Sequence, residues 1–170
     1  DVAYTMTLGR ECINPRPEDE KHIHNVFAKY GAGSISYSEG TNDDVNKFVW
    51  SDQDWNPETP VIETVRDYCR LFFGTDITES TAQGIMNLEK NFRGPLLTNK
   101  AVEQTLMLWQ DIENKAPQEL TLFNFRFQMC LLLAYYDALI QRRLIYETAL
   151  ESKAREVLQN ATPENIIAAI

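Results

Sequence analysis

Residues 120–160, with the sequence LTLFNFRFQMCLLLAYYDALIQRRLIYETALESKAREVLQN, contain no glycine or proline, and they decide the fold class. Apolar residues recur in it three or four positions apart, as on one face of an α-helix. They are Leu122, Phe125, Met129, Leu132, Leu133, Tyr136, Ile140, Leu144 and Ala154. The pattern predicts one very long helix, or two helices joined by a kink.

Shorter helical patterns precede this stretch and are separated by turn residues. Four helices are expected: one after a cap at 42–44, one over 61–73, one from a capping box at Asp76 and Glu79 to Gly94, and one from 99 to Pro117. The last should bury Val102, Leu106, Trp109 and Ile112. Residues 50–60 contain Pro57 and Pro60 and are expected to form a loop.

The first 40 residues have a different pattern. Residues 2–8 and 33–39 alternate in the way that predicts strands, and residues 17–30 predict a helix between them. We therefore expect a mainly α fold, a helical bundle with a short mixed α/β N-terminal segment. The mixed segment should span 1–40 and the helical bundle domain 41–170. A last helical pattern starts at Thr162 and stops with the chain, so we expect a piece of a larger protein.

The charge balance limits the classes of partner. Twenty-five acidic residues against sixteen Lys and Arg give a net charge of −9. This balance argues against broad contact with phosphate backbones or anionic lipid surfaces, so no nucleic acid or membrane partner is expected. The most apolar run, residues 129–136, is also too short for the roughly 20 apolar residues of a membrane span.

Cysteine and histidine are sparse. Cys12, Cys69 and Cys130 lie far apart in the sequence and are expected to be free. His22 and His24 are two positions apart, so on a helix they point in different directions and cannot chelate one metal ion. Both histidines are expected on the surface.

Four oxygen-bearing residues have the spacing of a calcium-binding loop: Asp52, Asp54, Asn56 and Glu63. Pro57 occupies the position where such a loop needs glycine for its turn, so a solvated loop is the preferred interpretation. No glycine-rich phosphate loop is present in the sequence either. We expect no metal site and no cofactor.

The densest polar cluster lies at residues 37–44, shortly before Trp50 and Trp55. Carboxylates beside aromatic rings are typical of sugar recognition, because acids bind hydroxyl groups and a ring packs on the apolar face of a pyranose. The alternative is structural: residues 42–44 cap a helix and the tryptophans fill the core.

Several stretches resemble large bacterial glycoside hydrolase-like proteins. They are YSEGTNDDVNKFVW at 37–50, WNP at 55–57, VRDYCRLFFG at 65–74, NFRGPLL at 91–97 and YYDA at 135–138. In that family, as in α-glucuronidases and hexosaminidases of similar architecture, a catalytic TIM barrel is followed by a helical C-terminal region. The resemblance implies that residues 1–40 include the end of the barrel.

The resemblance also implies a site. Residues 33–39 would be a late barrel strand, and Glu39 would lie at its C-terminal end, where barrel enzymes place active-site groups. Glu39 is therefore the one candidate catalytic carboxylate, and the implied substrate-binding residues are Tyr37, Glu39, Asn42, Asp43 and Trp50. The implied partners are a carbohydrate, bound through the parent protein, and the preceding catalytic domain. The resemblance further favours a secreted or periplasmic location.

Two functions follow. In the first, the chain is the C-terminal helical region of a glycoside hydrolase-like protein, supports the barrel and is inactive alone, because hydrolysis normally needs two carboxylates. In the second, it is a helical protein–protein interaction module that binds through the aromatic faces of its last helices. In either function, Arg126, Arg142 and Arg143 would bind an acidic partner or a sugar carboxylate, or would remain in solvent on a helix face. Exposure of Phe125, Met129, Leu132 and Tyr136 discriminates between these functions.

Overall fold

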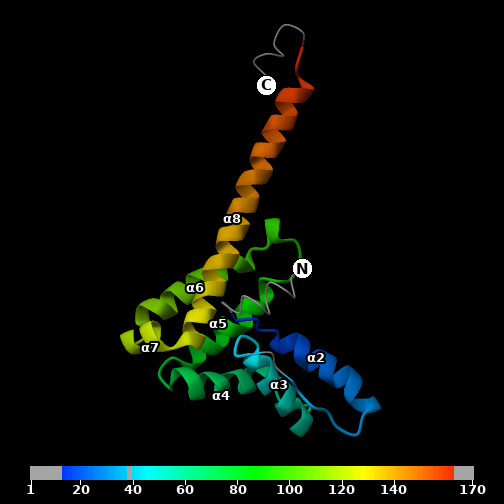
Figure 1. The fold of residues 1–170 in the computed structure, drawn as a ribbon, viewed down its shortest axis with the longest axis vertical. Helices are drawn as coiled ribbons and strands as arrows, with labels where there is room; N and C mark the ends of the chain where they lie inside the picture. Colours follow the sequence, from blue (N-terminus) through cyan, green and yellow to red (C-terminus); the bar gives the residue numbers. More distant parts are fainter. Residues whose placement is uncertain (1–12, 38–39, 163–170) are drawn as a thin grey trace.

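The computed structural model describes residues 13–37 and 40–162 of the chain. All regular structure in these residues is helical (Figure 1). The α-helices are α2 (Pro17–Phe27), α3 (Asp44–Trp55), α4 (Val61–Phe73), α5 (Thr78–Lys90), α6 (Ala101–Lys115), α7 (Gln118–Phe123) and α8 (Phe125–Gln159). Two 3-10 turns, Ala28–Tyr30 and Leu96–Thr98, complete the set. The predicted helical bundle is therefore confirmed.

The predicted mixed α/β N-terminal segment is wrong over the residues that the structure describes. Residues 33–37 form no strand, and Ile35 is 97% exposed. A strand needs a neighbour to pair its backbone groups, and no other strand is present in 13–37 or 40–162. The other predicted strand, residues 2–8, lies outside the described residues, as do Glu39 and the helix predicted to follow Thr162.

Two further boundaries differ from the sequence predictions. The predicted loop at 50–60 is wrong in its first half, because α3 continues to Trp55. The capping box predicted at Asp76 is also wrong, because α5 begins at Thr78 without a side-chain cap. Gly74 does end α4, with a φ of +92° that only glycine adopts easily.

A chain of aromatic rings within the core joins three helices. Tyr68 and Phe73 of α4 lie 6.1 Å apart between ring centroids, and Phe73 lies 5.8 Å from Phe127 of α8. Phe127 lies 5.8 Å from Trp109 of α6. These edge-to-face contacts add to the apolar burial of the rings, so α4, α6 and α8 share one packed centre. Val102, Leu106, Trp109 and Ile112 are all buried, as predicted.

A partly buried ion pair connects the start of α3 to this centre. The guanidinium of Arg126 in α8 donates to Asp44 Oδ2 at 2.9 Å from Nε and 2.8 Å from Nη2. Tyr68 Oη donates to Asp44 Oδ1 at 2.6 Å. The guanidinium also lies 4.0 Å from the ring centre of Phe72 and 4.7 Å from that of Phe125. One carboxylate therefore connects α3, α4 and α8.

Helix α8 is much longer than the body of the molecule requires (Figure 1). Asn124 separates it from α7: its side chain accepts a hydrogen bond from the Phe127 amide at 3.0 Å and donates to the Phe72 carbonyl at 2.7 Å. The first half of α8 packs on α5 and α6, whereas residues 143–159 project away from the body. We call residues 143–159 the arm.

Candidate functional site

Three of the five predicted sugar-binding residues lie around one shallow hollow. Tyr37, Asp43 and Trp50 line this hollow, which has a volume of about 240 Å³. Asn42 is buried, and its carbonyl accepts a hydrogen bond from the Asn14 amide at 2.7 Å. The fifth, Glu39, lies outside the described residues. We call this depression the Trp50 hollow.

The other residues that line the Trp50 hollow were not predicted. They are Glu20, Ile35, Ser36, Asn46 and Lys47. Lys47 could have been found, because it lies four positions after Asp43 and so shares a face of α3 with it. Glu20 was not singled out because it lies in the first turn of α2, where acidic residues interact favourably with the helix dipole. Partial burial raises the pKa of Glu20. The positive charge of Arg16 opposes this increase, and the nearby carboxylates of Asp19, Asp43 and Glu89 add to it.

The hollow has polar groups suited to hydroxyl-bearing ligands, although some are already used within the chain. Asn46 accepts a hydrogen bond from the Arg16 amide at 2.7 Å and donates to the Asn14 carbonyl at 2.8 Å. Glu20, Asp43 and Lys47 contribute acidic and basic groups beside the indole of Trp50. An indole face with flanking acids can hold a sugar, but the site is small and open.

His24 was predicted to lie on the surface, but it is buried. It belongs to a hydrogen-bonded series of polar side chains beside Trp50. It is 4% exposed, and its Nε2 lies 2.8 Å from Asp54 Oδ1. Ser34 Oγ donates to Asp54 Oδ2 at 2.5 Å and accepts from Trp50 Nε1 at 2.7 Å. These bonds, first that from Ser34 and then that from His24, lower the pKa of Asp54.

The three hydrogen-bonded side chains, Ser34, Asp54 and His24, are of the types found in a catalytic triad, but they are connected in a different order. In a triad the histidine contacts the hydroxyl and removes its proton, while the carboxylate orients the histidine. Here the carboxylate of Asp54 lies between Ser34 and His24, and the two imidazole nitrogens bond to Asn25 and Asp54. The arrangement fixes the segment around Ser34 to α3 and offers no activated nucleophile.

The four residues with calcium-loop spacing do not converge. Asp52 Oδ2 accepts a hydrogen bond from Thr64 Oγ1 at 2.5 Å, and Asp54 contacts His24 and Ser34. Glu63 pairs with Arg66 at 2.7 Å. Within 13–37 and 40–162, no group of three or more His, Cys, Asp or Glu residues is placed to hold a metal ion.

The buried cysteines are not nucleophiles. Cys69 and Cys130 are free, as predicted, and Cys12 lies outside the described residues. Burial raises the pKa of the Cys69 thiol to about 12 and that of Cys130 well above its ordinary value. Both thiols therefore remain protonated at neutral pH and act as small apolar groups in the core.

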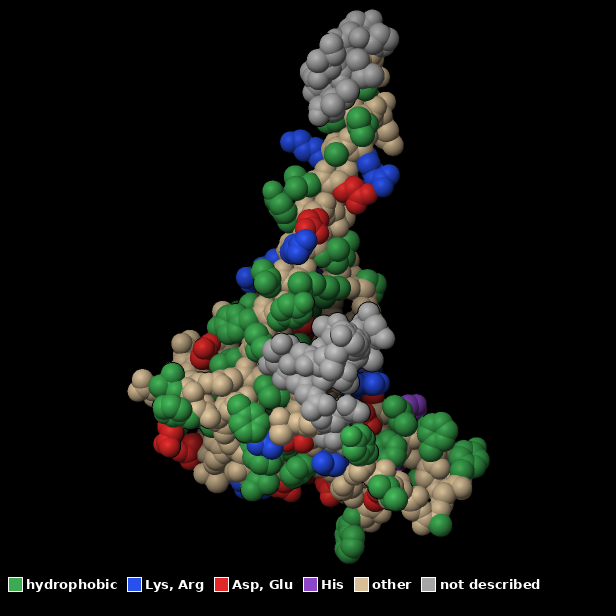
Figure 2. Space-filling view, in the orientation of Figure 1, with side chains coloured by type: hydrophobic (Ala, Val, Ile, Leu, Met, Phe, Trp, Pro, Cys, Tyr) green, Lys and Arg blue, Asp and Glu red, His purple; other side chains and the backbone are tan. Residues whose placement is uncertain are grey.

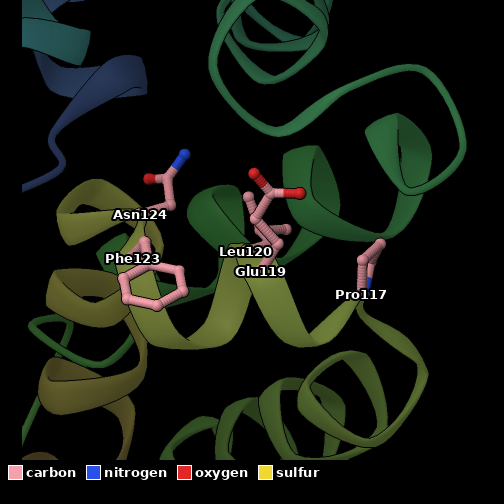
Figure 3. Close-up of a pocket in the computed structure, with 5 residues that line it drawn as sticks. All are labelled: Pro117, Glu119, Leu120, Phe123 and Asn124. Atoms are coloured by element: carbon pink, nitrogen blue, oxygen red, sulfur yellow. The ribbon is translucent and has the colours of Figure 1, made fainter.

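A second hollow, of about 400 Å³, lies beside α7 and is lined by Pro117, Glu119, Leu120, Phe123 and Asn124 (Figure 3). The carboxylate of Glu119 and the ring of Phe123 point in different directions. Asn124 is already used as the cap of α8. This hollow therefore has no converging polar groups of the kind that define a ligand site.

The three arginines singled out in the sequence have intramolecular partners. Arg126 pairs with the buried Asp44. Arg142 makes two hydrogen bonds to Glu103 of α6, at 2.7 and 2.8 Å. Arg143 pairs with Glu147, four residues further along α8, at 2.6 Å. Arg126 is thus structural, while Arg142 and Arg143 remain on the surface.

Helix α8 carries many exposed apolar side chains. Met129 is buried, but Phe125, Leu132 and Tyr136 are 47%, 43% and 53% exposed. The exposure continues along the arm, where apolar side chains alternate with charged ones (Figure 2). The exposed apolar residues of α8 are Phe125, Leu132, Tyr135, Tyr136, Leu139, Ile145, Tyr146, Leu150, Val157 and Leu158. So many exposed apolar side chains on one helix are unusual.

None of the helices in the described part of the chain combines the length and apolar character that crossing a membrane requires. We compared the chain with protein-family models, with curated proteins and with solved structures. No match was found in any of the three. The functional argument therefore rests on the residues and their geometry.

Proposed function

We propose that this chain is a helical protein–protein interaction module and that α8 is its binding element. The observation that supports the proposal is the exposure of Phe125, Leu132 and Tyr136 together with the projecting arm. If the sequence served only to build a bundle, these residues would be expected inside it. An apolar row on the outside of a helix is instead typical of a surface that another helix covers.

The arm also lacks the tertiary contacts that would stabilise it as a helix. Almost every residue from 145 to 160 is exposed, so the tertiary contacts that stabilise most helices are missing. Isolated helices of fewer than about 12–15 residues are marginal in water, and this arm is only slightly longer. A partner that covers the arm would supply the missing contacts.

Hydrogen exchange of the full-length protein tests this proposal. If a partner covers α8, the amides of residues 143–159 exchange slowly, at rates comparable with those of α6. Protection that depends on protein concentration indicates a second copy, and protection independent of concentration indicates another part of the same protein. Rapid exchange of the arm under all conditions would overturn the proposal, and α6 provides the internal reference.

A second candidate function is supported by the Trp50 hollow. We propose, as the alternative, that the chain is the C-terminal helical region of a glycoside hydrolase-like protein and contributes one wall of a carbohydrate site. The grouping of Tyr37, Asp43 and Trp50 around one hollow supports it. The test is calorimetric titration with glucuronides and aryl glycosides, comparing Trp50→Phe with Trp55→Phe, whose ring is 90% exposed elsewhere on α3.

The expected outcome is weaker binding for Trp50→Phe and unchanged binding for Trp55→Phe. Equal effects of the two substitutions, or no heat of binding for the unaltered protein, would remove this candidate. Turnover of aryl glycosides by the full-length protein, and its loss in Glu39→Gln, would test the carboxylate that the sequence resemblance implies.

A further inference from the structure

The exposed residues of α8 form a regular heptad pattern. Starting at Leu132, the positions 132, 136, 139, 143, 146, 150, 153 and 157 are alternately four and three residues apart. This is the spacing of the a and d positions of a coiled coil. The residues are Leu132, Tyr136, Leu139, Arg143, Tyr146, Leu150, Lys153 and Val157, and all eight are exposed. We call this row the outer seam.

The outer seam lies on the side of α8 that faces away from the body. The residues that pack α8 onto its neighbours include Cys130, Ala134, Ala138 and Gln141, which share the opposite face of the helix. A helix approaching the seam would therefore meet α8 from the open side. At 1.5 Å per residue the seam is about 38 Å long, enough for a two-stranded coiled coil of more than three heptads.

Two cations, Arg143 and Lys153, interrupt the apolar pattern of the seam. They decide the direction in which two copies of α8 can pair. In a parallel, in-register pair of α8 helices, each seam residue meets its own copy. Arg143 would then face Arg143 of the second chain, and Lys153 would face Lys153. Like charges facing each other in a seam are unfavourable, so parallel pairing of two copies is disfavoured.

Antiparallel pairing of two copies removes this conflict in one register. If Leu139 of one copy faces Leu150 of the other, Leu132 faces Val157, and the apolar residues pair with apolar residues. In the same register Arg143 faces Tyr146, and Lys153 faces Tyr136. Each seam cation thus meets a tyrosine ring, which is a favourable cation–π arrangement. A shift of one helix by a whole heptad, which would set Leu139 against Val157, would set Arg143 against Lys153.

The structure already contains such an arrangement of arginine, ring and carboxylate. Arg126 lies over Phe72 and Phe125 while it pairs with Asp44. The planar guanidinium allows both, because its edge donates hydrogen bonds while its face stacks on a ring. Arg143 pairs with Glu147 along its own helix. Its face is therefore compatible with the ring of a tyrosine from the second copy.

We propose that two copies of this chain pair through their outer seams, antiparallel and with Leu139 of each facing Leu150 of the other. This inference rests on the proposed function and specifies its partner as a second copy. The contact is isologous, since the same residues are used on both sides of a two-fold axis. The cation–tyrosine pairs select the direction and register, as polar residues at seam positions do in coiled coils.

Sedimentation across a dilution series gives the first test, with a matched pair of variants. Leu150 and Ile145 are 49% and 48% exposed, but Leu150 lies on the outer seam and Ile145 lies away from it. We expect Leu150→Glu to shift the protein from the mass of two chains to that of one. Ile145→Glu should leave the two-chain mass unchanged. Equal dissociation by both variants, or a single-chain mass for the unaltered protein, would overturn the proposal.

Disulfide trapping tests direction and register. In a background with Cys12 replaced by serine, Leu139→Cys and Leu150→Cys are prepared as separate proteins. The proposed register predicts a disulfide between them when they are mixed and oxidised, and little disulfide when either is oxidised alone. Rapid self-linking of Leu139→Cys alone would show parallel pairing and overturn the proposed arrangement.

The failure of this inference and the failure of the proposed function have different signatures. A protein that stays at the mass of one chain, while its arm amides are protected from exchange, excludes the second copy but keeps the interaction module. A single-chain mass with unprotected arm amides removes both. Circular dichroism of each variant verifies that the helical body is intact.

Discussion

Glu89 of α5 caps the N-terminus of α2 with both of its carboxylate oxygens. Oε2 accepts a hydrogen bond from the Glu18 amide and Oε1 accepts one from the Asp19 amide, each at 3.0 Å. The side chain is buried, and Arg93 pairs with it at 3.1 Å. Free amides and a partial positive charge at the start of a helix attract a carboxylate, so Glu89 supplies from a distant helix the cap that α2 lacks locally.

Replacing Glu89 should therefore weaken the attachment of α2. We expect Glu89→Ala to lower the free energy of unfolding by about 3 kcal/mol, because two helix amides lose their acceptor and Arg93 loses a partner. The measurement is urea unfolding followed by circular dichroism. Glu79→Ala on the same helix is the control: its carboxylate pairs with Arg66 in solvent, so its loss should lower the free energy of unfolding much less than the loss of Glu89. Equal losses for the two would contradict the capping role.

Removing Arg126 should cost more than removing the hydroxyl of Tyr68. Arg126→Met leaves the buried carboxylate of Asp44 without its ion-pair partner, and we expect a loss of about 3–5 kcal/mol. Tyr68→Phe removes one hydrogen bond to the same carboxylate and should cost about 1–3 kcal/mol. Denaturant unfolding of both variants checks the order, and a smaller effect for Arg126→Met would argue against the ion pair as the main connection.

Gly84 should not tolerate alanine, although alanine is the better helix former. A Cβ atom at this position would lie 2.8 Å from two ring carbons of Trp109, which is itself fully buried. We expect overpacking of about 1–3 kcal/mol to exceed the gain in helix propensity of about 1 kcal/mol. Thermal unfolding measures the difference. Gly33→Ala, where no atom lies within 4 Å of the new Cβ, should be close to neutral. A more stable Gly84→Ala would show that Trp109 moves aside easily.

Asp137 should make stability depend on pH in a direction opposite to that of most carboxylates. Burial raises the pKa of Asp137 to about 6, against a weaker lowering by the hydrogen bond from Asn91. Because the folded pKa is above that of the unfolded chain, the native state holds the proton more tightly. The resulting penalty is absent below about pH 4, grows between about pH 4 and 6, and is complete above that range.

We therefore expect Asp137→Asn to stabilise the protein at pH 7.5 by up to about 3 kcal/mol, the equivalent of the pKa difference. The advantage should disappear as the pH falls to about 4. The amide can still accept the hydrogen bond from Asn91, which lies 2.8 Å from Asp137 Oδ2. Unfolding free energies of both proteins across this pH range provide the measurement, and a constant difference would contradict the raised pKa.

The helices could be predicted from the sequence where apolar spacing and burial agree. Val102, Leu106, Trp109 and Ile112 share one stripe, and all four are buried in α6. The same rule could not find the end of α3, because its last turns bury polar residues. Gln53 is fully buried and donates to the Thr59 carbonyl at 3.1 Å. Only the folded chain supplies such an acceptor.

The candidate site shows a similar limit. The position of His24 depends on Asp54, which lies 30 residues further along the chain, so its burial could not be inferred from local spacing. In α8, Leu132 and Leu133 belong to one apolar pattern in the sequence, yet Leu133 is buried and Leu132 exposed. A helix that is apolar on two faces gives one periodic signal, and only packing shows which face is inside.

The separation of the arm from the body also separates the charge of the molecule. Between residues 143 and 159, Arg143, Lys153 and Arg155 balance Glu147, Glu151 and Glu156, so the arm is neutral. The whole net charge of −9 therefore belongs to the rest of the chain. Two paired copies would hold strongly acidic bodies at opposite ends of a neutral junction. Added salt screens repulsion between such bodies, so the association should tighten as ionic strength rises, the reverse of an interface held by ion pairs.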